Sequence, residues 1–341
     1  MRAKIWTWVA ALGLACSVSA GVHAQAAQDF YRNKQIRMII GHPVGGDYDV
    51  GGRVLAKHLP KHIPGQPAVI VQNMPAAGSI VAANYLHNQA PRDGTVFGSF
   101  SRNFPSQALM GQNNIEADPR RFNYLGATSL PSRVCVHWHT ARVKTLADLF
   151  TQELITAGAS AGTSLSIIPT VLNHVLGTKF RVIEGYKGIS DSILAIERGE
   201  VEGVCSSFGQ FRNQERLMRE GKLRVLLRAE EAPIAAIPDV PTIYAYAKTN
   251  EQRQFLRFVL STTEFGRPYV FPPDVPQDRV EIMRKALADA ARDAELLAEA
   301  DKMKLDMSYH SPAHLERLLA NLYQTPPEMV EAVRKLIPNL Q

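Results

Sequence analysis

The sequence predicts an α/β protein with two lobes, and three observations support that prediction. Short apolar runs alternate with helical segments from Phe30 onward, which is the pattern of βαβ units. The chain has 341 residues, which is long for a single hydrophobic core. Loops rich in glycine and serine follow several expected strands, and ligands bind at this end of mostly parallel strands.

The first residues indicate an exported chain. Two basic residues precede a mostly apolar stretch and a small-x-small motif, namely Arg2, Lys4, residues 5–18 and Val22-His23-Ala24. This is the composition of a secretory signal peptide, so we expect residues 1–24 to be removed and the protein to reside in the periplasm. Cys16 leaves lipidation as an alternative, although Gly13 stands where a lipobox has leucine. No later apolar run approaches the ~18 residues that a spanning helix needs.

Charge argues against nucleic acid as a partner. The formal net charge is +6, and loss of a leader that carries Arg2 and Lys4 would lower it to +4. The basic residues are spread along the chain without runs or interleaved aromatic residues, so we expect no nucleic-acid binding. A mildly basic exported protein is compatible with acidic solutes.

Two cysteines, Cys135 and Cys205, remain beyond the leader. An even number in an oxidising compartment permits one disulfide, and we expect these two residues to form it. Both lie in apolar, strand-like segments, so a pair of buried free thiols is the alternative. A Cα separation beyond ~7 Å would exclude the bridge.

The expected elements alternate along most of the chain. Strands are predicted at residues 36–40, 68–73, 96–100, 134–137, 156–159, 181–184, 203–206, 225–228 and 257–261. Helices are predicted at residues 49–59, 79–88, 106–110, 145–150, 165–176, 189–198, 210–220, 242–247, 278–291, 294–302, 312–323 and 328–335. Residues suited to helix N-termini support these starts: Asp49, Ser79, Ser190 or Asp191, and Ser311 followed by Pro312.

Both ends of the chain are expected to build one lobe, with the second lobe inserted between them. Residues 121–131 have the character of a crossing between lobes, and a return crossing is expected near residues 257–263. The proline-rich piece 268–276 resembles an exposed turn. We therefore assign residues 25–129 and 257–341 to the first lobe and residues 130–256 to the second.

Four loops at the ends of expected strands have the composition of anion-binding loops, namely residues 42–49 (HPVGGDYD), 73–79 (NMPAAGS), 101–106 (SRNFPS) and 158–166 (GASAGTSLS). In the first loop, Gly45 and Gly46 let backbone N–H groups approach a ligand, and the following helix adds its N-terminal donors. Such loops also contain glycine, serine and aspartate for turn and capping reasons. The presence of four of them favours ligand binding.

Residues 184–208 form a further strand–loop–helix–strand unit. Tyr186 and Gly188 lie in its loop, and Asp191 is expected to cap the helix, with ligand contact as the alternative. The second strand brings Ser206 to the same side of the sheet.

A serine hydrolase is an alternative, because Gly158-Ala159-Ser160-Ala161-Gly162 matches the G-x-S-x-G nucleophile elbow. Asp191 or Asp239, with His310 or His314, would have to complete the triad. The two histidines belong to a segment that we assign to the other lobe, and no HGGG-type oxyanion loop is present. We therefore expect no catalytic residues.

We expect neither a metal nor a cofactor. His58 and His62 have i, i+4 spacing, but Pro60 breaks that helix and the glutamate of an HExxH motif is absent. His137 and His139 share one face of a strand without a clear third ligand. The sequence contains no P-loop and no GxGxxG motif for a nucleotide.

Several motifs, in order along the chain, carry a family resemblance. They are HPVGGDYD, VIVQNMPAAGSIVAANYL, APRDGTVFGSF, VLNHVLGTKF, GYKGISDSILAIERGEVEG, PDVPTIYAYA and FGRPYVFPPDVPQDRVEIMRKAL. The chain beyond the leader resembles the substrate-binding proteins of tripartite tricarboxylate transporters, the Bug family. The resemblance implies a type II periplasmic binding fold, with two α/β lobes, a central ligand cleft and two crossovers. It also implies that loops from both lobes hold the carboxylate of a small organic acid.

The resemblance maps the first binding loop onto residues 43–49 and the second-lobe contacts onto residues 160–164 and 186–188. With the loops above, the expected ligand-binding residues are Pro43, Val44, Gly45, Gly46, Asp47, Tyr48, Asp49, Gly78, Ser79, Ser101, Arg102, Ser160, Gly162, Thr163, Ser164, Tyr186, Gly188, Asp191 and Ser206.

This chain departs from the family pattern at two positions of the first loop and at one place in the second. Val44 and Asp47 stand where the family often has a proline and a third glycine, and Ala76-Ala77 stands where a second glycine is usual before Gly78. The carboxylate of Asp47 would repel an anionic ligand unless it points away or binds an amino group. An acid that also carries an amino or hydroxyl group therefore becomes a candidate ligand.

The resulting hypothesis is a monomeric periplasmic receptor without catalysis. It would capture a small carboxylate or aromatic acid and deliver it to the membrane subunits of a tripartite tricarboxylate-type transporter. The alternative is an accessory protein whose ligand-bound form docks on a sensor.

Overall fold

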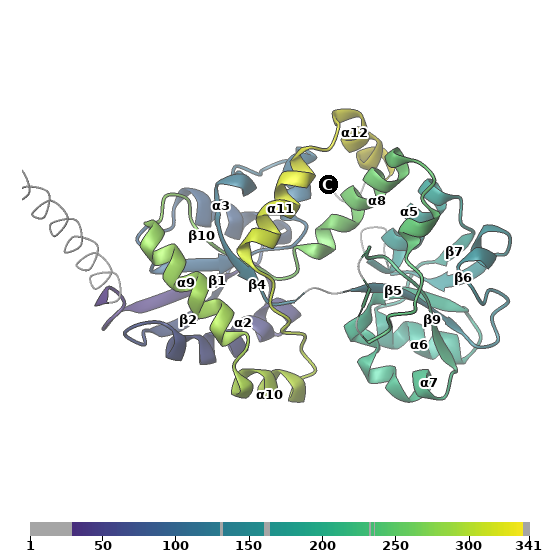
Figure 1. Ribbon diagram of the computed structural model, residues 1–341, viewed down its shortest axis with the longest axis horizontal. Coiled ribbons are helices and arrows are strands. Elements are labelled where there is room, and N and C mark those ends of the chain that lie inside the picture. The colour runs from purple at the N-terminus through teal and green to yellow at the C-terminus, as the bar shows by residue number, and fades with distance from the viewer. Residues whose placement is uncertain (1–28, 130–131, 160–163, 232, 235, 337–341) are drawn as a thin grey trace, which may run out of the picture.

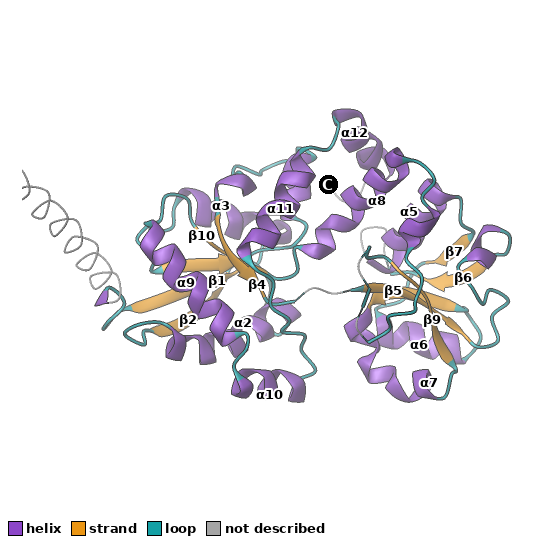
Figure 2. Ribbon diagram, in the orientation of Figure 1, coloured by secondary structure: helices purple, strands orange, loops and turns teal. Residues whose placement is uncertain are grey.

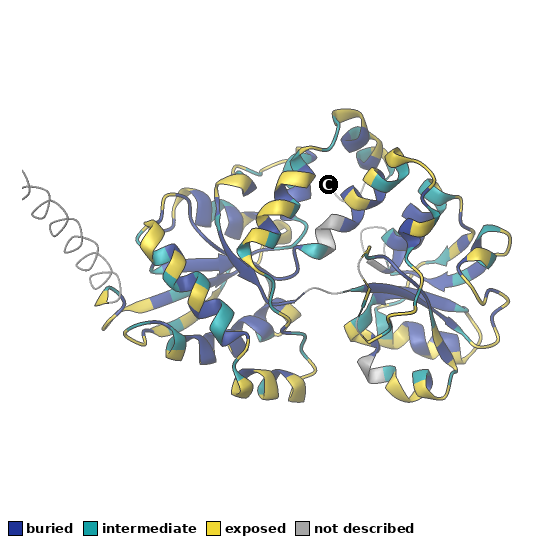
Figure 3. Ribbon diagram, viewed as in Figure 1, coloured by how far each residue is buried: buried dark blue, intermediate teal, exposed yellow. Residues whose placement is uncertain are grey.

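The computed structural model describes residues 29–129, 132–159, 164–231, 233–234 and 236–336. These residues form two lobes, each built around a five-stranded sheet with helices packed on it (Figure 1). Figure 2 shows the strands at the centre of each lobe, with helices around them. The strands are largely buried, and the exposed residues gather on the outer faces of the helices (Figure 3). The predicted α/β class with two lobes is confirmed.

The first sheet has the strand order β2-β1-β3-β10-β4. Strand β1 pairs in parallel with β2 and β3, whereas β10 is antiparallel to both β3 and β4. One edge of this sheet therefore collects the carboxyl ends of β1 to β4 and the amino end of β10. The bounds are β1 Gln35–Ile40, β2 Ala68–Asn73, β3 Val96–Ser99, β4 Asn123–Ala127 and β10 Pro268–Phe271.

The second sheet has the order β7-β6-β8-β5-β9. Strand β6 is parallel to β7 and β8, and β5 runs antiparallel to β8 and β9. The amino end of β5 therefore shares an edge with the carboxyl ends of its neighbours. The bounds are β5 Arg133–Trp138, β6 Leu154–Ala157, β7 Phe180–Ile183, β8 Gly203–Ser207 and β9 Leu223–Arg228.

Most predicted helices are present, with ends shifted by a few residues. The α-helices are α2 Asp47–His58, α3 Ile80–Asn88, α4 Phe104–Leu109, α5 Ser164–Leu176, α6 Ile189–Glu197, α7 Glu215–Arg219, α8 Asn250–Glu264, α9 Gln277–Ala290, α10 Ala294–Lys302, α11 Pro312–Tyr323 and α12 Pro327–Leu336. Short 3-10 helices are η1 Leu59–His62, η2 Ala77–Ser79, η3 Pro119–Arg121, η4 Ala147–Phe150, η5 Phe208–Gln214 and η6 Ile243–Tyr246. None of the helices within the described ranges has the length and apolar character to span a bilayer.

One predicted strand is wrong: residues 257–261 lie in helix α8 instead. Buried apolar side chains there follow one another closely, at Phe255, Leu256, Phe258, Val259 and Leu260. Such a run resembles a strand, because the helix buries a wide face. Helix α8 packs against α5 of the second lobe and against α11 and α12, so more than one stripe of the helix is covered.

One further prediction for the first sheet is wrong, and another needs narrower bounds. Residues 268–276 were expected to be an exposed turn, but Pro268–Phe271 is strand β10, buried between β3 and β4. The prolines suggested a turn, and Pro268 is tolerated because it is the first residue of its strand. Residues 121–131 were expected to cross between the lobes; Asn123–Ala127 is strand β4, and the chain passes to the second lobe after that strand.

The two connections between the lobes touch each other. The first leads from β4 to β5, and the second leads from α8 through Gly266 to β10. A Cβ atom on Gly266 would lie 1.6 Å from the carbonyl oxygen of Ser129, and its φ is +57°, so only glycine fits this contact. The expected domain boundary at residue 256 falls inside α8, and that division stays a prediction.

Candidate functional site

The candidate site lies where the polar edges of the two sheets meet. Strand β4 ends at Ala127 and β5 begins at Arg133, so five residues separate the two edges along the chain. The phenol of Tyr48 and the guanidinium of Arg102, both from the first lobe, influence the pKa of Arg133 in the second lobe. Loops of the first lobe therefore lie close to the start of β5.

Asp49 holds the first loop in shape. Its carboxylate is 2 % exposed and accepts hydrogen bonds from the Gly45 N–H at 2.8 Å, Arg53 Nε at 2.9 Å and Asn73 Nδ2 at 2.8 Å. These donors together lower the pKa of Asp49, against the opposing effect of burial. The expected helix start at Asp49 is wrong, because α2 begins at Asp47 and Gly46 is its N-cap residue. Asp49 is thus placed to fix the loop.

The tip of the first loop is exposed. Pro43, Gly45 and Gly46 are exposed, and Val44 is 72 % exposed. Gly45 has a φ of +84°, which a residue with a side chain rarely adopts. Asp47 is exposed at the start of α2, which brings its carboxylate to the positive end of the helix dipole.

Tyr48 connects the first loop to the loop after β3. Its hydroxyl accepts the backbone N–H of Arg102 at 3.0 Å and donates to the carbonyl of Gly266 at 3.2 Å. His42 stacks on the Tyr48 ring at 3.7 Å between centroids, and the Arg102 guanidinium lies 5.8 Å from the ring centre. Burial, together with the Arg102 charge, lowers the pKa of His42 to about 4, so this imidazole is neutral at neutral pH.

Arg267, which the sequence did not single out, anchors this part of the first lobe. Its guanidinium donates to the carbonyls of Asp47 and Thr128 at 3.0 Å each and also to the carbonyl of Asp306. A Cβ atom on Gly51 would lie 2.7 Å from Arg267 Nη1, so a glycine in α2 leaves room for this guanidinium. The first turn of α2 is thereby bound to the first crossing.

Ser79 has a structural partner, as do parts of the neighbouring predicted loops. The Ser79 hydroxyl is buried and donates to the Gly41 carbonyl at 2.8 Å, and it lies 3.3 Å from His42 Nδ1. Gly78 is exposed beside it. Ser101 accepts the Asn103 N–H through its side chain at 3.2 Å. These contacts hold the loops at the sheet edge.

The predicted second-lobe contacts are described in part. Ser160, Gly162 and Thr163 lie outside the described residues, and Ser164 is the first residue of α5. The serine of the predicted nucleophile elbow therefore has no geometry to assess. The nearby loop is pinned to the sheet edge, because the N–H of Tyr186 donates to the Gly158 carbonyl at 3.1 Å.

Three other predicted residues of the second lobe have partners within the lobe. Gly188, rather than Ser190 or Asp191, is the N-cap residue of α6. Asp191 lies in the first turn and accepts the Lys187 N–H at 3.1 Å, so its carboxylate holds the loop before the helix. Ser206 is 2 % exposed and donates to the side-chain oxygen of Gln210.

Two residues that the sequence did not single out lie at the same edge. Arg133 begins β5 and is 8 % exposed, and burial together with the Arg102 charge lowers its pKa to about 9. Glu230 follows β9, and its carboxylate accepts the backbone N–H of Arg133. Burial raises the pKa of Glu230 to about 7. A single basic residue at the start of an apolar strand is the only sequence signal for Arg133.

Cys135 and Cys205 lie directly opposite each other on the antiparallel strands β5 and β8. Their Cα atoms are 4.0 Å apart, and a disulfide joins the two sulfurs. Both residues are fully buried, so the bridge joins the two central strands beneath the site edge.

Two cavities elsewhere contain none of the predicted binding residues. One, of about 490 Å³, is lined by residues of α8, α11 and α12 and by Glu231. Burial raises the pKa of Glu264 in that cavity, and Glu231 pairs with Arg257 at 2.8 Å, which does not favour an anion. The other, of about 450 Å³, is lined by residues 291–309.

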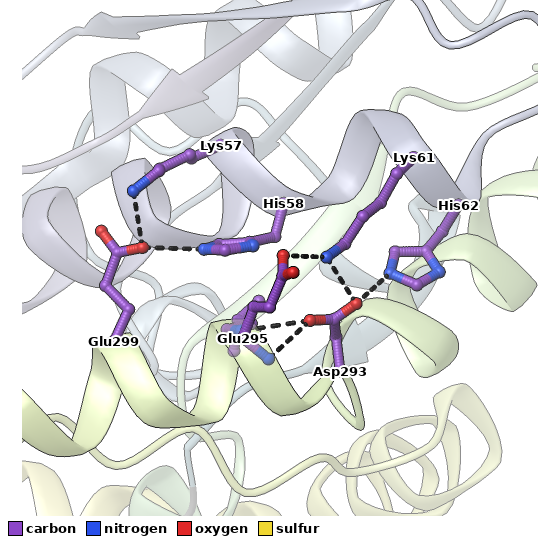
Figure 4. Close-up of polar contacts among 8 residues, drawn as sticks. Lys57, His58, Lys61, His62, Asp293, Glu295 and Glu299 are labelled. Carbon is purple, nitrogen blue, oxygen red and sulfur yellow. Dashed lines mark hydrogen bonds and ion pairs between the residues drawn. The ribbon is translucent and has the colours of Figure 1, made fainter.

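Helix α10 is joined to α2 and η1 by ion pairs (Figure 4). Lys57 and His58 contact Glu299 at 2.8 Å each, whereas Lys61 contacts Asp293 at 2.7 Å and Glu295 at 2.9 Å. Within the described residues, His58, Asp293 and Glu295 come close enough to hold a metal ion. The Lys61 ammonium already occupies the space between the two carboxylates, so we assign these groups to helix packing.

Two α/β lobes whose sheet edges meet at polar loops define a two-lobed solute-binding architecture. Solved structures share this fold. A TctC solute-binding protein from Polaromonas, solved without ligand, aligns with a TM-score of 0.69 at 19 % identity over 91 % of this chain and 99 % of that one. MatC of Rhodopseudomonas palustris with bound malate aligns with a TM-score of 0.54 at 16 % identity, over 89 % of this chain and 99 % of MatC. An R. palustris protein with adipate aligns with a TM-score of 0.57 at 16 % identity, over 90 % of this chain and 98 % of that protein.

Sequence comparison identifies the family. The model of the tripartite tricarboxylate transporter family receptor matches residues 52–333. A Cupriavidus necator relative, the UPF0065 protein in the gbd 5' region, is 31 % identical over 88 % of this chain and 87 % of its own length. BugT of Bordetella pertussis is 41 % identical over a shorter stretch, 19 % of this chain and 20 % of its own. The chain belongs to the tripartite tricarboxylate transporter receptor family, and the predicted resemblance is confirmed.

Proposed function

We propose that this chain is an exported receptor that captures a small organic acid between its lobes and delivers it to a tripartite tricarboxylate-type transporter. The observation that carries the proposal is the positive charge where the sheet edges meet. Arg102 and Arg133 come to this edge from different lobes, and burial, together with the charge of Arg102, lowers the pKa of both Arg133 and His42. A positive field at a ligand edge favours an anion.

The likeness to proteins solved with malate and adipate supports a carboxylate ligand. The leader-like first residues support export to the periplasm, where such a receptor would meet its ligand. Capture would proceed by rotation of the lobes about the two crossings, which encloses the acid and strengthens each polar contact by excluding water.

A thermal-shift screen tests the binding step. The panel consists of malate, adipate, succinate, citrate, glutamate and benzoate, with glucose as the uncharged control and cadaverine, which has no carboxylate, as the cationic control. An acid at ~100 times its dissociation constant should stabilise the folded protein by ~2.7 kcal/mol. If none of the acids raises the melting temperature above the two controls, the proposal fails.

Delivery to a transporter is tested separately from binding. We expect cells that lack the gene for this chain to lose uptake of the radiolabelled acid and to regain it on complementation. Normal uptake, with a lost transcriptional response to the acid, would instead identify a protein that serves a sensor.

We also propose that the chain has no hydrolase activity. A fluorophosphonate probe should leave Ser160 unlabelled in the folded protein, because an unactivated serine does not react with it. Labelling of Ser160 that disappears in Ser160→Ala would contradict this.

A further inference from the structure

Arg133 is a buried cation whose guanidinium has no hydrogen-bond or ion-pair partner among the described residues. Its side chain begins β5 at the site edge and is 8 % exposed. The buried Nε atom has no hydrogen-bond partner, and the guanidinium forms no ion pair with any described residue. The adjacent carboxylate of Glu230 accepts the main-chain N–H of Arg133, while its second oxygen is itself buried without a partner. The carboxylate of Glu230 attracts the Arg133 charge from nearby, but it forms no ion pair or hydrogen bond with the guanidinium.

Arg102 presents a second positive charge from the other lobe. The hydrogen bond from its backbone N–H to the Tyr48 hydroxyl fixes the loop, and the side chain lies beside the Tyr48 ring. The guanidinium has no acidic partner among the described residues. Arg102 and Arg133 are close enough for their charges to repel. Two like charges, one from each lobe, therefore lie near enough to influence each other where the lobes meet.

An unpaired buried charge is costly, so a fold usually pairs it or neutralises it. Two other buried arginines have acceptors within the protein: the guanidinium groups of Arg267 and Arg228 both donate to backbone carbonyls. No described residue offers such an acceptor to the Arg133 guanidinium. The partner of this charge is therefore expected to be a ligand.

We propose that Arg133 and Arg102 form a two-arginine clamp that binds the negatively charged group of the ligand from both lobes at once. The inference rests on the proposed function and adds the residues that recognise the anion. The planar guanidinium fork matches a carboxylate with two parallel hydrogen bonds. Without ligand, the repulsion between the arginines keeps the lobes apart, and the bound anion removes that repulsion. The same pair therefore binds the ligand and couples its arrival to closure.

Calorimetric titration with malate and adipate tests the clamp. Arg133→Met and Arg102→Gln should each weaken binding of the better probe by about 30-fold or more, the range for loss of one partner from a buried charge pair. Arg133→Lys should weaken it less than Arg133→Met, because the charge stays and the fork is lost. The control is Arg142→Gln, which removes the same charge from an exposed residue beyond the other end of β5 and should leave affinity unchanged. Unchanged affinity in both Arg133→Met and Arg102→Gln would overturn the clamp.

Urea unfolding without ligand measures whether Arg133 stabilises the fold. Its result does not depend on whether the proposed function is correct. Removal of an unpaired buried charge should leave Arg133→Met at least as stable as the wild type. A large loss of stability in Arg133→Met, with Arg142→Gln unaffected, would show that Arg133 supports the fold and would overturn the clamp. If the wild type binds no acid, the proposed function fails, and this ligand-free measurement still decides whether Arg133 serves the fold.

Discussion

Two aspartates of one loop have different environments, although they are two residues apart. Asp49 is buried with three hydrogen-bond donors on its carboxylate, whereas Asp47 is exposed. The sequence suggested that Asp47 distinguishes the ligand of this chain, and that prediction stands untested. The contacts of Asp49 explain why an acidic residue can lie beside an anion site: Arg53 and Asn73 satisfy its charge within the first lobe.

Asp49→Asn should lower the free energy of unfolding by roughly 1–3 kcal/mol, because the amide leaves Arg53 or the Gly45 N–H without its acceptor. Urea denaturation followed by circular dichroism measures it. The matched control, Asp47→Asn, should stay within ~0.5 kcal/mol of the wild type. Equal losses in both variants would contradict the structural role of Asp49.

Glu230 gives the stability of the protein a pH dependence. Its folded-state pKa of about 7 lies above its ordinary value of 4.5. Between those two values the folded protein keeps a proton that the unfolded chain releases, so the Glu230 contribution falls as the pH rises through this window. Glu230→Gln keeps an acceptor for the Arg133 N–H and removes the ionisation.

We therefore expect Glu230→Gln to be more stable than the wild type at about pH 8, by roughly 1–3 kcal/mol. Near pH 4 the two proteins should differ little, since the wild-type side chain is then protonated in the folded state. Urea unfolding at both pH values measures the difference. A difference that is the same at both would show that the carboxyl group does not titrate as inferred.

At the residue scale, the sequence located loops better than it located contacts. It placed Tyr48 and Arg102 at strand ends, where the structure has them at the meeting of the lobes. It did not find Arg133 or Glu230, because their importance depends on burial and on a residue from the other lobe. Ser79 and Asp49 were expected to bind ligand; their polar atoms form hydrogen bonds within the first lobe, and a ligand contact by either stays a prediction.

At the element scale, strands with a clear apolar run in the βα order were found, such as β1 and β2. The errors have a common cause: each concerns a segment that packs between elements distant from it in the sequence. Helix α8 is amphipathic over its whole length, but its buried residues are nearly consecutive between Phe255 and Leu260, where α5, α11 and α12 pack on it. Strand β10 begins with Pro268 and is followed by two more prolines, which disguises it as a turn. Local patterns carry little information on such long-range placement.

The disulfide joins β5, which begins at Arg133, to β8, which contains Ser206. It therefore lies beside residues of the candidate site. Reduction of the Cys135–Cys205 bridge, which spans 70 residues of chain, should lower the free energy of unfolding by roughly 2–4 kcal/mol. Urea unfolding with and without dithiothreitol measures the effect. The double variant Cys135→Ala and Cys205→Ala should show no response to the reductant. A wild type insensitive to reduction, with both thiols shown to be free, would contradict the expectation.

At the scale of the whole molecule, the two crossings form one joint. Gly266 packs against the carbonyl of Ser129, and Tyr48 reaches the Gly266 carbonyl from the binding loop. The joint is therefore in direct contact with the candidate site. If the lobes rotate on binding, as proposed above, the motion would act on the first loop through the contact of Tyr48 with Gly266.

Gly266→Ala should destabilise the protein by about 2 kcal/mol or more, because the new methyl group overlaps the Ser129 carbonyl and the φ is left-handed. Gly209→Ala is the matched control, since a Cβ there meets no atom within 4 Å. Urea unfolding measures stability, and small-angle scattering measures the lobe arrangement. Equal behaviour of the two variants would show that the crossings are not in tight contact.

The position of β10 sets an order in which the protein can be completed. All strands of the second sheet lie between Arg133 and Arg228, whereas the first sheet needs Pro268–Phe271 between β3 and β4. A chain that emerges from a ribosome or a membrane channel amino end first therefore presents β3 and β4 long before the strand that joins them. The second lobe can fold while the first sheet still lacks the strand between β3 and β4. The lobe that begins the chain is the last to be finished.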